Sequence, residues 1–267
     1  YENKYYKYED PEYSITQTPL NEQDLKMMSE AVEVLRQFKG FSYFTEMSDI
    51  INRLEDHVAS ARMKTTPVID FEKNESLKGL DYLDTIYHAI VNEHPIQLKY
   101  RSFKARSANS FIFYPYLLKE YRNRWFVYGV RGNGRILQNL ALDRIQSLEV
   151  LPQQHYIKNT FFDPNTFFDD LVGVTKNSGS VAEKVGFKVA AAEAPYIITK
   201  PIHRSQQVVE RLADGSVILE IKVVINHELE RVFFGYAEGI QVLYPKTLVE
   251  LMGRKLKKAA EQYTHSK

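Results

Sequence analysis

The stretch that decides the fold runs from Phe111 to Ile145 and reads FIFYPYLLKEYRNRWFVYGVRGNGRILQNLALDRI. Aromatic residues, Arg and Lys fill it, and aromatic residues are enriched in strands. Near its middle, Gly132-Asn133-Gly134 is a hairpin turn signal. The stretch therefore predicts two or three consecutive antiparallel β-strands.

The residues before this stretch extend the prediction. Residues 80–92 carry apolar side chains at helical spacing and predict a helix. The segment IQLKYRSF that follows alternates cleanly, with Ile96, Leu98 and Tyr100 on one face of a strand. One helix followed by four or five antiparallel strands is the outline of a small β-barrel, which we place at residues 77–155.

The N-terminal part predicts helices. Residues 21–40 and 45–58 carry apolar residues at helical spacing, and both helices are short enough to need a partner surface. We therefore expect residues 1–76 to form a helical connector or dimerisation segment rather than an independent domain. The chain begins with Tyr1 and not with Met, so we expect that processing or cloning removed an upstream segment.

The C-terminal part predicts a second domain. Residues 156–180 are rich in turn signals and predict a linker. Residues 181–267 predict the element order βαββαβ of a ferredoxin-like domain, followed by one extra helix. The fold class expected for the whole chain is α+β.

Charge is unevenly distributed along the chain. Residues 96–146 contain ten Lys or Arg and two acids, a net charge of +8, whereas all 267 residues together carry +1 and the remainder must therefore carry −7. A local positive field beside aromatic rings suits a polyanion with stackable bases. The ten cations are Lys99, Arg101, Lys104, Arg106, Lys119, Arg122, Arg124, Arg131, Arg135 and Arg144.

Several protein classes are disfavoured by composition. No stretch approaches the roughly 18 consecutive apolar residues of a membrane helix, and the polar start YENKYYKYEDPE is unlike a signal peptide. The absence of Cys excludes disulfides and thiolate chemistry and fits a reducing compartment. We expect a cytoplasmic protein with no membrane partner.

Enzymatic motifs are missing as well. The seven His show no HxH or HxxxH spacing, and the sequence has neither GxSxG nor a P-loop. We therefore expect no catalytic residue, no metal site and no cofactor. The expectation is that the chain is not an enzyme.

Three motifs in order carry a family resemblance. Pro115-Tyr116, then Arg124-Trp125-Phe126-Val127, then Leu142-Asp143-Arg144-Ile145 resemble the WYL domain, with Phe126 in place of the signature tyrosine and Val127 in place of leucine. The tail from residue 239 to 263 resembles the C-terminal extension that commonly follows this domain. The opening residues 5–40 resemble the connector of bacterial WYL regulators.

The resemblance implies an Sm-like barrel that senses an effector within a homodimeric bacterial transcriptional regulator. In this family a winged helix-turn-helix, which would contact duplex DNA, usually precedes the connector, and we expect it in the missing upstream segment. The ligands implied are nucleic acids, single-stranded DNA especially, or nucleotides.

Strand alternation suggests where such a ligand would bind. Arg122, Arg124, Phe126 and Tyr128 share one face, and they point outward together if Trp125 and Val127 point inward. Arg144 is favoured by its family position, and Asp143 beside it is expected not to pair with it because strand neighbours face opposite ways. By the same alternation, only one of Tyr100 and Arg101 is expected to reach the ligand. The residues predicted to bind the ligand are Tyr100, Arg101, Tyr116, Lys119, Arg122, Arg124, Phe126, Tyr128, Arg131 and Arg144.

Other interpretations stay open at this point. These side chains could simply cover an exposed sheet face. A competing function is a protein–protein interaction or accessory module that docks on a nuclease or a ribonucleoprotein. A nucleotide-acting enzyme is a third class.

Overall fold

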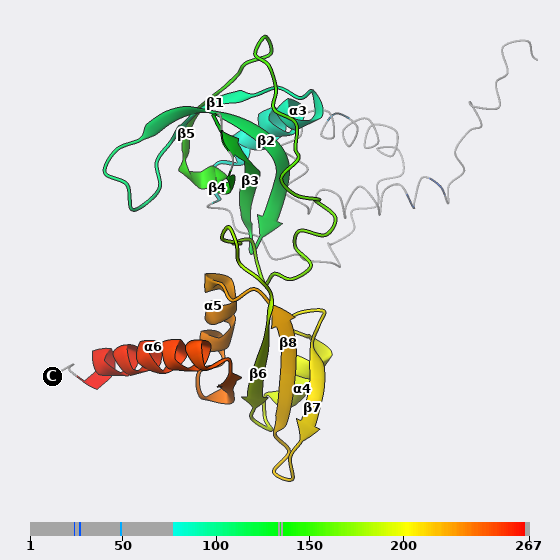
Figure 1. The fold of residues 1–267 in the computed structure, drawn as a ribbon, viewed down its shortest axis with the longest axis vertical. Coiled ribbons are helices and arrows are strands. Elements are labelled where there is room, and N and C mark those ends of the chain that lie inside the picture. The colour runs from blue at the N-terminus through cyan, green and yellow to red at the C-terminus, as the bar shows by residue number, and fades with distance from the viewer. Residues whose placement is uncertain are drawn as a thin grey trace, which may run out of the picture. The chain divides into compact units, whose positions relative to one another are not determined.

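A computed structural model describes residues 77–132, 134 and 136–264, together with Asp24, Met27 and Asp49, which are helical. The rest of the predicted connector helices, and Asn133 of the predicted hairpin turn, lie outside the described residues. The chain divides into two compact units, residues 1–84 and 85–267. Figure 1 shows the described elements, and their α+β class is confirmed.

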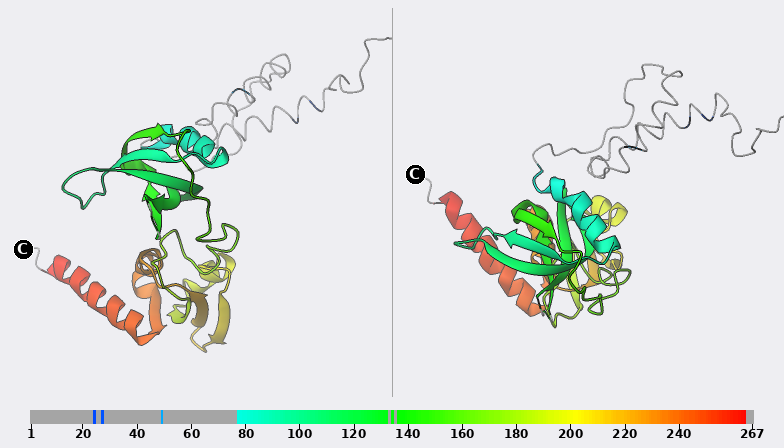
Figure 2. Two further views of the ribbon diagram at one scale, coloured as in Figure 1. Left: turned by 45° about the horizontal axis from the view of Figure 1, so that its top comes forward. Right: turned by 90° about the horizontal axis from the view of Figure 1, so that it is seen from above.

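The first sheet has five strands in the antiparallel order β4-β3-β2-β1-β5. Figure 2 shows the loop between β1 and β2 extending away from this sheet. The helix expected at residues 80–92 is confirmed, beginning with a 3-10 turn. The elements are η4 (Leu80–Tyr82), α3 (Leu83–Val91), β1 (Ile96–Tyr100), β2 (Asn109–Tyr121), β3 (Arg124–Arg131), β4 (Leu137–Ala141), η5 (Leu142–Arg144) and β5 (Ile145–Val150).

Two details of this sheet differ from simple strand alternation. Arg122 and Asn123 form the tight turn between β2 and β3, with φ of 50° and 60°, so Arg122 is a turn residue and not a strand residue. Positive φ at both central residues is the geometry of a type I′ hairpin. The segment after β4 is also broken, because η5 separates β4 from β5.

The second sheet, also antiparallel, has the order β7-β8-β6-β9. The element order βαββαβ and the extra helix α6 are as the sequence predicts, while the Sm-like and ferredoxin-like names for the two sheets stay predictions. The elements are β6 (Glu183–Val189), α4 (Ala194–Thr199), β7 (Gln207–Arg211), β8 (Val217–Val223), α5 (His227–Gly235), η6 (Ala237–Gly239), β9 (Ile240–Tyr244) and α6 (Lys246–Thr264).

The core of the second sheet follows from period-two alternation. Phe187 in β6 and Leu219 in β8 are fully buried and pair directly in the register. Phe187 also packs against Phe233 of α5, with ring centroids 5.1 Å apart. Asn226 starts α5 as its N-cap, accepting a hydrogen bond from the Leu229 N–H at 2.9 Å.

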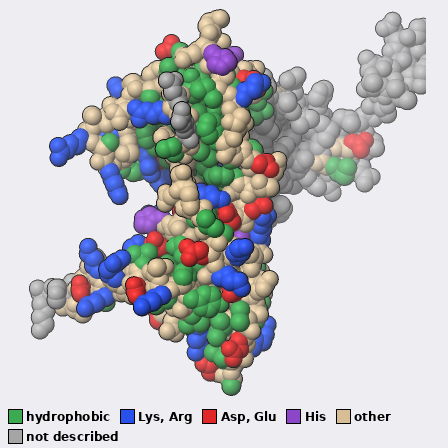
Figure 3. Space-filling model, in the orientation of Figure 1, with side chains coloured by type: hydrophobic (Ala, Val, Ile, Leu, Met, Phe, Trp, Pro, Cys, Tyr) green, Lys and Arg blue, Asp and Glu red, His purple; other side chains and the backbone are tan. Residues whose placement is uncertain are grey.

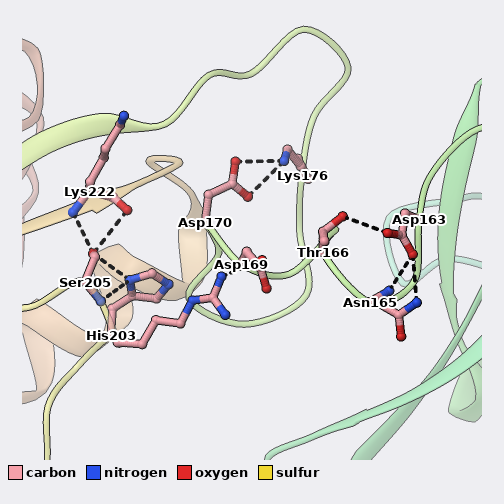
Figure 4. A network of polar contacts seen from close by, with 10 residues as sticks. Asp163, Asn165, Thr166, Asp169, Asp170, Lys176, His203, Ser205 and Lys222 are labelled. Atoms are coloured by element: carbon pink, nitrogen blue, oxygen red, sulfur yellow. Dashed lines mark hydrogen bonds and ion pairs between the residues drawn. The ribbon is translucent and has the colours of Figure 1, made fainter.

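The segment between β5 and β6 has neither helix nor strand, and polar contacts fix its course. Figure 4 shows Lys176 Nζ donating to both carboxylate oxygens of Asp170, at 2.8 and 2.9 Å. It also shows Ser205 between the ring of His203 and the backbone of Lys222.

Within the described residues, no helix has the length and apolar character required to cross a membrane.

Candidate nucleic-acid interface

A pocket of about 260 Å³ lies where the end of β1 meets η5 and the start of β5. A backbone hydrogen bond from Arg101 N to Arg144 O, at 3.1 Å, holds its two walls together. Figure 3 shows Lys and Arg side chains over the β1–β2 loop that forms one wall. The lining residues are Arg101, Ser102, Phe103, Asp143, Arg144, Ile145 and Gln146.

One carboxylate serves two arginines beside this pocket. Asp143 Oδ2 lies 3.3 Å from Arg124 Nε, and its Oδ1 lies 3.9 Å from Arg144 Nε. The second distance is an ion pair but too long for a hydrogen bond. The prediction that Asp143 and Arg144 do not pair is therefore wrong, because residues 142–144 form a 3-10 turn in which neighbouring side chains do not alternate.

Tyr100 and Arg101 take different positions at the pocket. Arg101 lines it and is exposed, whereas Tyr100 is half-buried. Burial raises the pKa of the Tyr100 hydroxyl, and the positive charge of Arg144 partly offsets that rise. Of this pair, only Arg101 is among the residues that line the pocket.

Phe103 is a pocket residue that the sequence analysis missed. Its side chain is 72% exposed, and the guanidinium carbon of Arg144 lies 4.6 Å from its ring centroid. Such a cation–π contact fixes one face of the ring. The signal that could have identified it is an aromatic residue in a loop that also carries Arg101, Lys104 and Arg106.

Tyr128 is not on an open face, so the expectation that it points outward to solvent is wrong. It is only 2% exposed, and its hydroxyl donates to the backbone oxygen of Val174. Three linker rings cover it: the centroids of Phe162, Phe167 and Phe168 lie 6.2, 5.8 and 5.4 Å from its own. Burial raises the pKa of Tyr128 well above its usual range.

Tyr116 is covered in the same way. It is 8% exposed and packs against Tyr156 and Phe161, each with a centroid separation of 6.1 Å. Burial raises its pKa to about 12. Among the described residues, its buried hydroxyl has no hydrogen-bond partner.

Four other predicted residues lie away from the pocket lining. Lys119 Nζ sits 4.8 Å from the ring centroid of Phe168, and Arg122 lies 5.5 Å from that of Tyr121. Arg131 lies 4.1 Å from the ring centroid of Phe111. Phe126 is half-buried and pairs with Lys119 in the register of β2 and β3. The ten predicted residues therefore do not form one surface.

The structure brings together a smaller set than predicted. Arg101 and Arg144 line the pocket, and Arg124 reaches it through Asp143. The described part of the chain holds no group of three or more His, Asp or Glu arranged to bind a metal ion. What the pocket offers is guanidinium groups beside one exposed ring, which suits an anion that carries a flat apolar group.

Solved structures show a distant likeness to this chain. Proteasome accessory factor B/C (PafBC) of Arthrobacter aurescens is 16% identical, over 72% of this chain and 28% of that one, with a TM-score of 0.29. A structure described as a CRISPR Cas-related protein is 11% identical, over 94% of this chain and 89% of the other, with a TM-score of 0.45. Neither likeness supports a functional conclusion, because both TM-scores are below 0.5.

Family comparison is more specific. None of the curated proteins compared matches the sequence. The WYL domain matches residues 81–150, and the WCX domain matches residues 182–260. The resemblance carried by the three motifs in the first sheet is thereby confirmed. The chain thus contains a WYL domain followed by a WCX domain.

Proposed function

We propose that this chain is the ligand-sensing and dimerising part of a bacterial WYL-type transcriptional regulator. Its WYL domain binds a single-stranded nucleic-acid fragment, DNA or RNA, or a nucleotide. The observation that carries the proposal is the pocket at which Arg101, Phe103 and Arg144 meet. The proposed role is binding, without a catalytic step or a cofactor.

The chemistry of the pocket supports this choice of ligand. A guanidinium can donate two parallel hydrogen bonds to one phosphate, which a lysine ammonium cannot do in a fixed geometry. Arg101 is exposed, and within the described residues no carboxylate lies at ion-pair distance from it. Phe103 offers a ring face, and stacking on an aromatic side chain contributes about 1–3 kcal/mol per base.

Regulation requires that the ligand bind one arrangement of the regulator better than another. Typical coupling free energies of this kind are about 1–3 kcal/mol. In the proposal, a cytoplasmic homodimer passes the ligand state through the connector to a preceding helix-turn-helix. Duplex DNA is contacted there and not by the WYL domain.

Fluorescence anisotropy at two salt concentrations tests the binding proposal. The probes are a short labelled single-stranded DNA, the RNA of the same sequence and a labelled nucleotide. Affinity should fall steeply with salt, because each neutralised phosphate releases counterions. Salt-insensitive binding, or none, would contradict the proposal and favour the interaction-module alternative.

Two variants locate the site. Arg144→Ala should weaken binding about tenfold or more while leaving the melting temperature of the domain unchanged. Arg131→Ala removes an equally charged side chain that lies on Phe111 instead of the pocket, and it should bind nearly as the parent does. If Arg144→Ala melts the domain but keeps residual affinity, Arg144 is a structural residue and the assignment fails.

A further inference from the structure

We propose that the pocket recognises a terminal phosphate, that is, a phosphomonoester at the end of a short strand or on a mononucleotide, in preference to an internal phosphodiester. The inference rests on the proposed function and names the ligand group that the pocket selects. Three observations carry it: the charge balance of the pocket, its size, and the position of Phe103 beside Arg144.

The charge balance favours a dianion. Two arginines pair with one carboxylate, and Arg124 is the closer partner of Asp143, at 3.3 Å against 3.9 Å for Arg144. Asp143 is thus offset mainly by Arg124, which leaves Arg101 and Arg144 as excess positive charges on the lining. A phosphomonoester carries about −1.5 to −2 at pH 7. An internal phosphodiester carries only one negative charge and leaves part of the positive charge of Arg101 and Arg144 unneutralised.

The size of the pocket favours an end over a passing strand. Its volume of about 260 Å³ lies below the roughly 300–1,000 Å³ of pockets that enclose drug-sized ligands. Proteins that bind strands without an end preference instead use grooves that follow about 4–16 nucleotides. The seven lining residues come from two short segments. The pocket therefore has room for one charged group and not for a run of several nucleotides.

Phe103 places a base beside that charged group. One face of its ring is held against Arg144, and the side chain is 72% exposed, so much of the ring is open to a ligand. A phosphate between Arg101 and Arg144 would leave the attached nucleoside at this rim. The pocket then binds the terminal phosphate and Phe103 stacks the terminal base.

The test compares the same short single-stranded DNA with a 5′-phosphate, with a 3′-phosphate, and with hydroxyls at both ends, the label being internal. At least one phosphorylated form should bind about tenfold more tightly than the hydroxyl form. Arg101→Gln should remove that advantage, whereas Arg131→Gln should keep it. A nucleoside monophosphate as competitor separates recognition of a strand end from recognition of a free nucleotide.

The pH provides a second readout. The second pKa of a phosphomonoester is near 6, so the advantage should shrink as the pH falls from about 7.5 to about 5.5. Arginine guanidinium groups in proteins stay charged over this range. Among the described residues that line the pocket, the carboxylate is that of Asp143.

The outcomes separate the two proposals. If all three strands bind equally and binding depends on salt, recognition of a terminal phosphate is refuted while nucleic-acid binding stands. If none of the strands and no mononucleotide binds, both proposals fall. An advantage that persists in Arg101→Gln would place the phosphate elsewhere and also refute the inference.

Discussion

Two regions of the WYL domain contain the same residue types and differ in what covers them. The pocket beside β1 has arginines and Phe103, and it is open to solvent. The face of β2 and β3 has Tyr116 and Tyr128, and linker phenylalanines bury both. The difference shows that strand alternation identifies the side chains that share a face of the sheet. It does not show which face is covered by a segment that lies far away in the sequence.

The largest expected effect is on the covered face. Tyr128→Ala should lower the free energy of unfolding by about 3–5 kcal/mol, because it deletes a buried aromatic ring packed against three others. Phe103→Ala is the matched control on the open side and should change it by less than about 0.5 kcal/mol. Urea denaturation measures both. Equal losses in the free energy of unfolding for the two variants would show that the two regions do not differ in burial, contrary to the account.

On the open side, Phe103→Ala should weaken the binding of a short strand about fivefold to tenfold. Loss of one stacked base accounts for this, at the lower end of the usual range because the side chain is 72% exposed. Phe103→Trp, which keeps a stacking ring, should bind like the parent in the same anisotropy titration. Unchanged affinity in Phe103→Ala would show that the ring is not part of the site.

Alkaline pH should probe the covered face through Tyr116. Its folded pKa of about 12 lies above the value near 10 of an unfolded tyrosine. Its contribution to stability is therefore complete below pH 10 and is lost as the pH rises from about 10 to 12. In Tyr116→Phe, the free energy of unfolding should fall less across this window.

At neutral pH the same variant should be as stable as the parent or more stable by up to about 1 kcal/mol. The reason is that the buried Tyr116 hydroxyl finds no hydrogen-bond partner in the described part of the chain. Chemical denaturation at several pH values gives both results. A strong loss of stability at pH 7 would reveal a partner for this hydroxyl and contradict the account.

The smallest effect is expected for Arg124→Gln. Its ion pair with Asp143 is partly exposed, at 46% for the arginine side chain, so stability should change by less than about 1 kcal/mol. Affinity for a short strand should fall about twofold to threefold. Without Arg124, the negative charge of Asp143 offsets more of the positive charge of Arg144, which then attracts the phosphate less. A loss as large as that of Arg144→Ala would mean that Arg124 itself contacts the ligand.

Much of the fold could be predicted because local signals suffice for it. Alternation identified β1, and the predicted order βαββαβ separates β7 from β8, which are joined by a turn where Gly215 has φ of 82°. A helix between the third and fourth strands of the second sheet was likewise predicted, and α5 is that helix. Each of these signals lies within a few residues of the element that it specifies.

The candidate site was harder to predict because its determinants are not local. The 3-10 turn at residues 142–144 interrupts a run that reads as strand, and it turns Arg144 toward Asp143. The burial of Tyr128 depends on Phe168, forty residues later in a segment that reads as a linker. Neither the turn nor the cover follows from the periodicity of the strand itself.

The central claim is that Arg101 and Arg144, and not the aromatic face, provide the phosphate contacts. The most direct test is the salt dependence of single-stranded DNA binding in the parent and in the double variant Arg101→Ala, Arg144→Ala. Each neutralised phosphate contributes about 0.7 to the slope of log K against log salt on a single strand. Because both arginines contact one phosphate, the double variant should have a slope shallower by about 0.7 and a lower affinity. An unchanged slope and affinity would contradict the account.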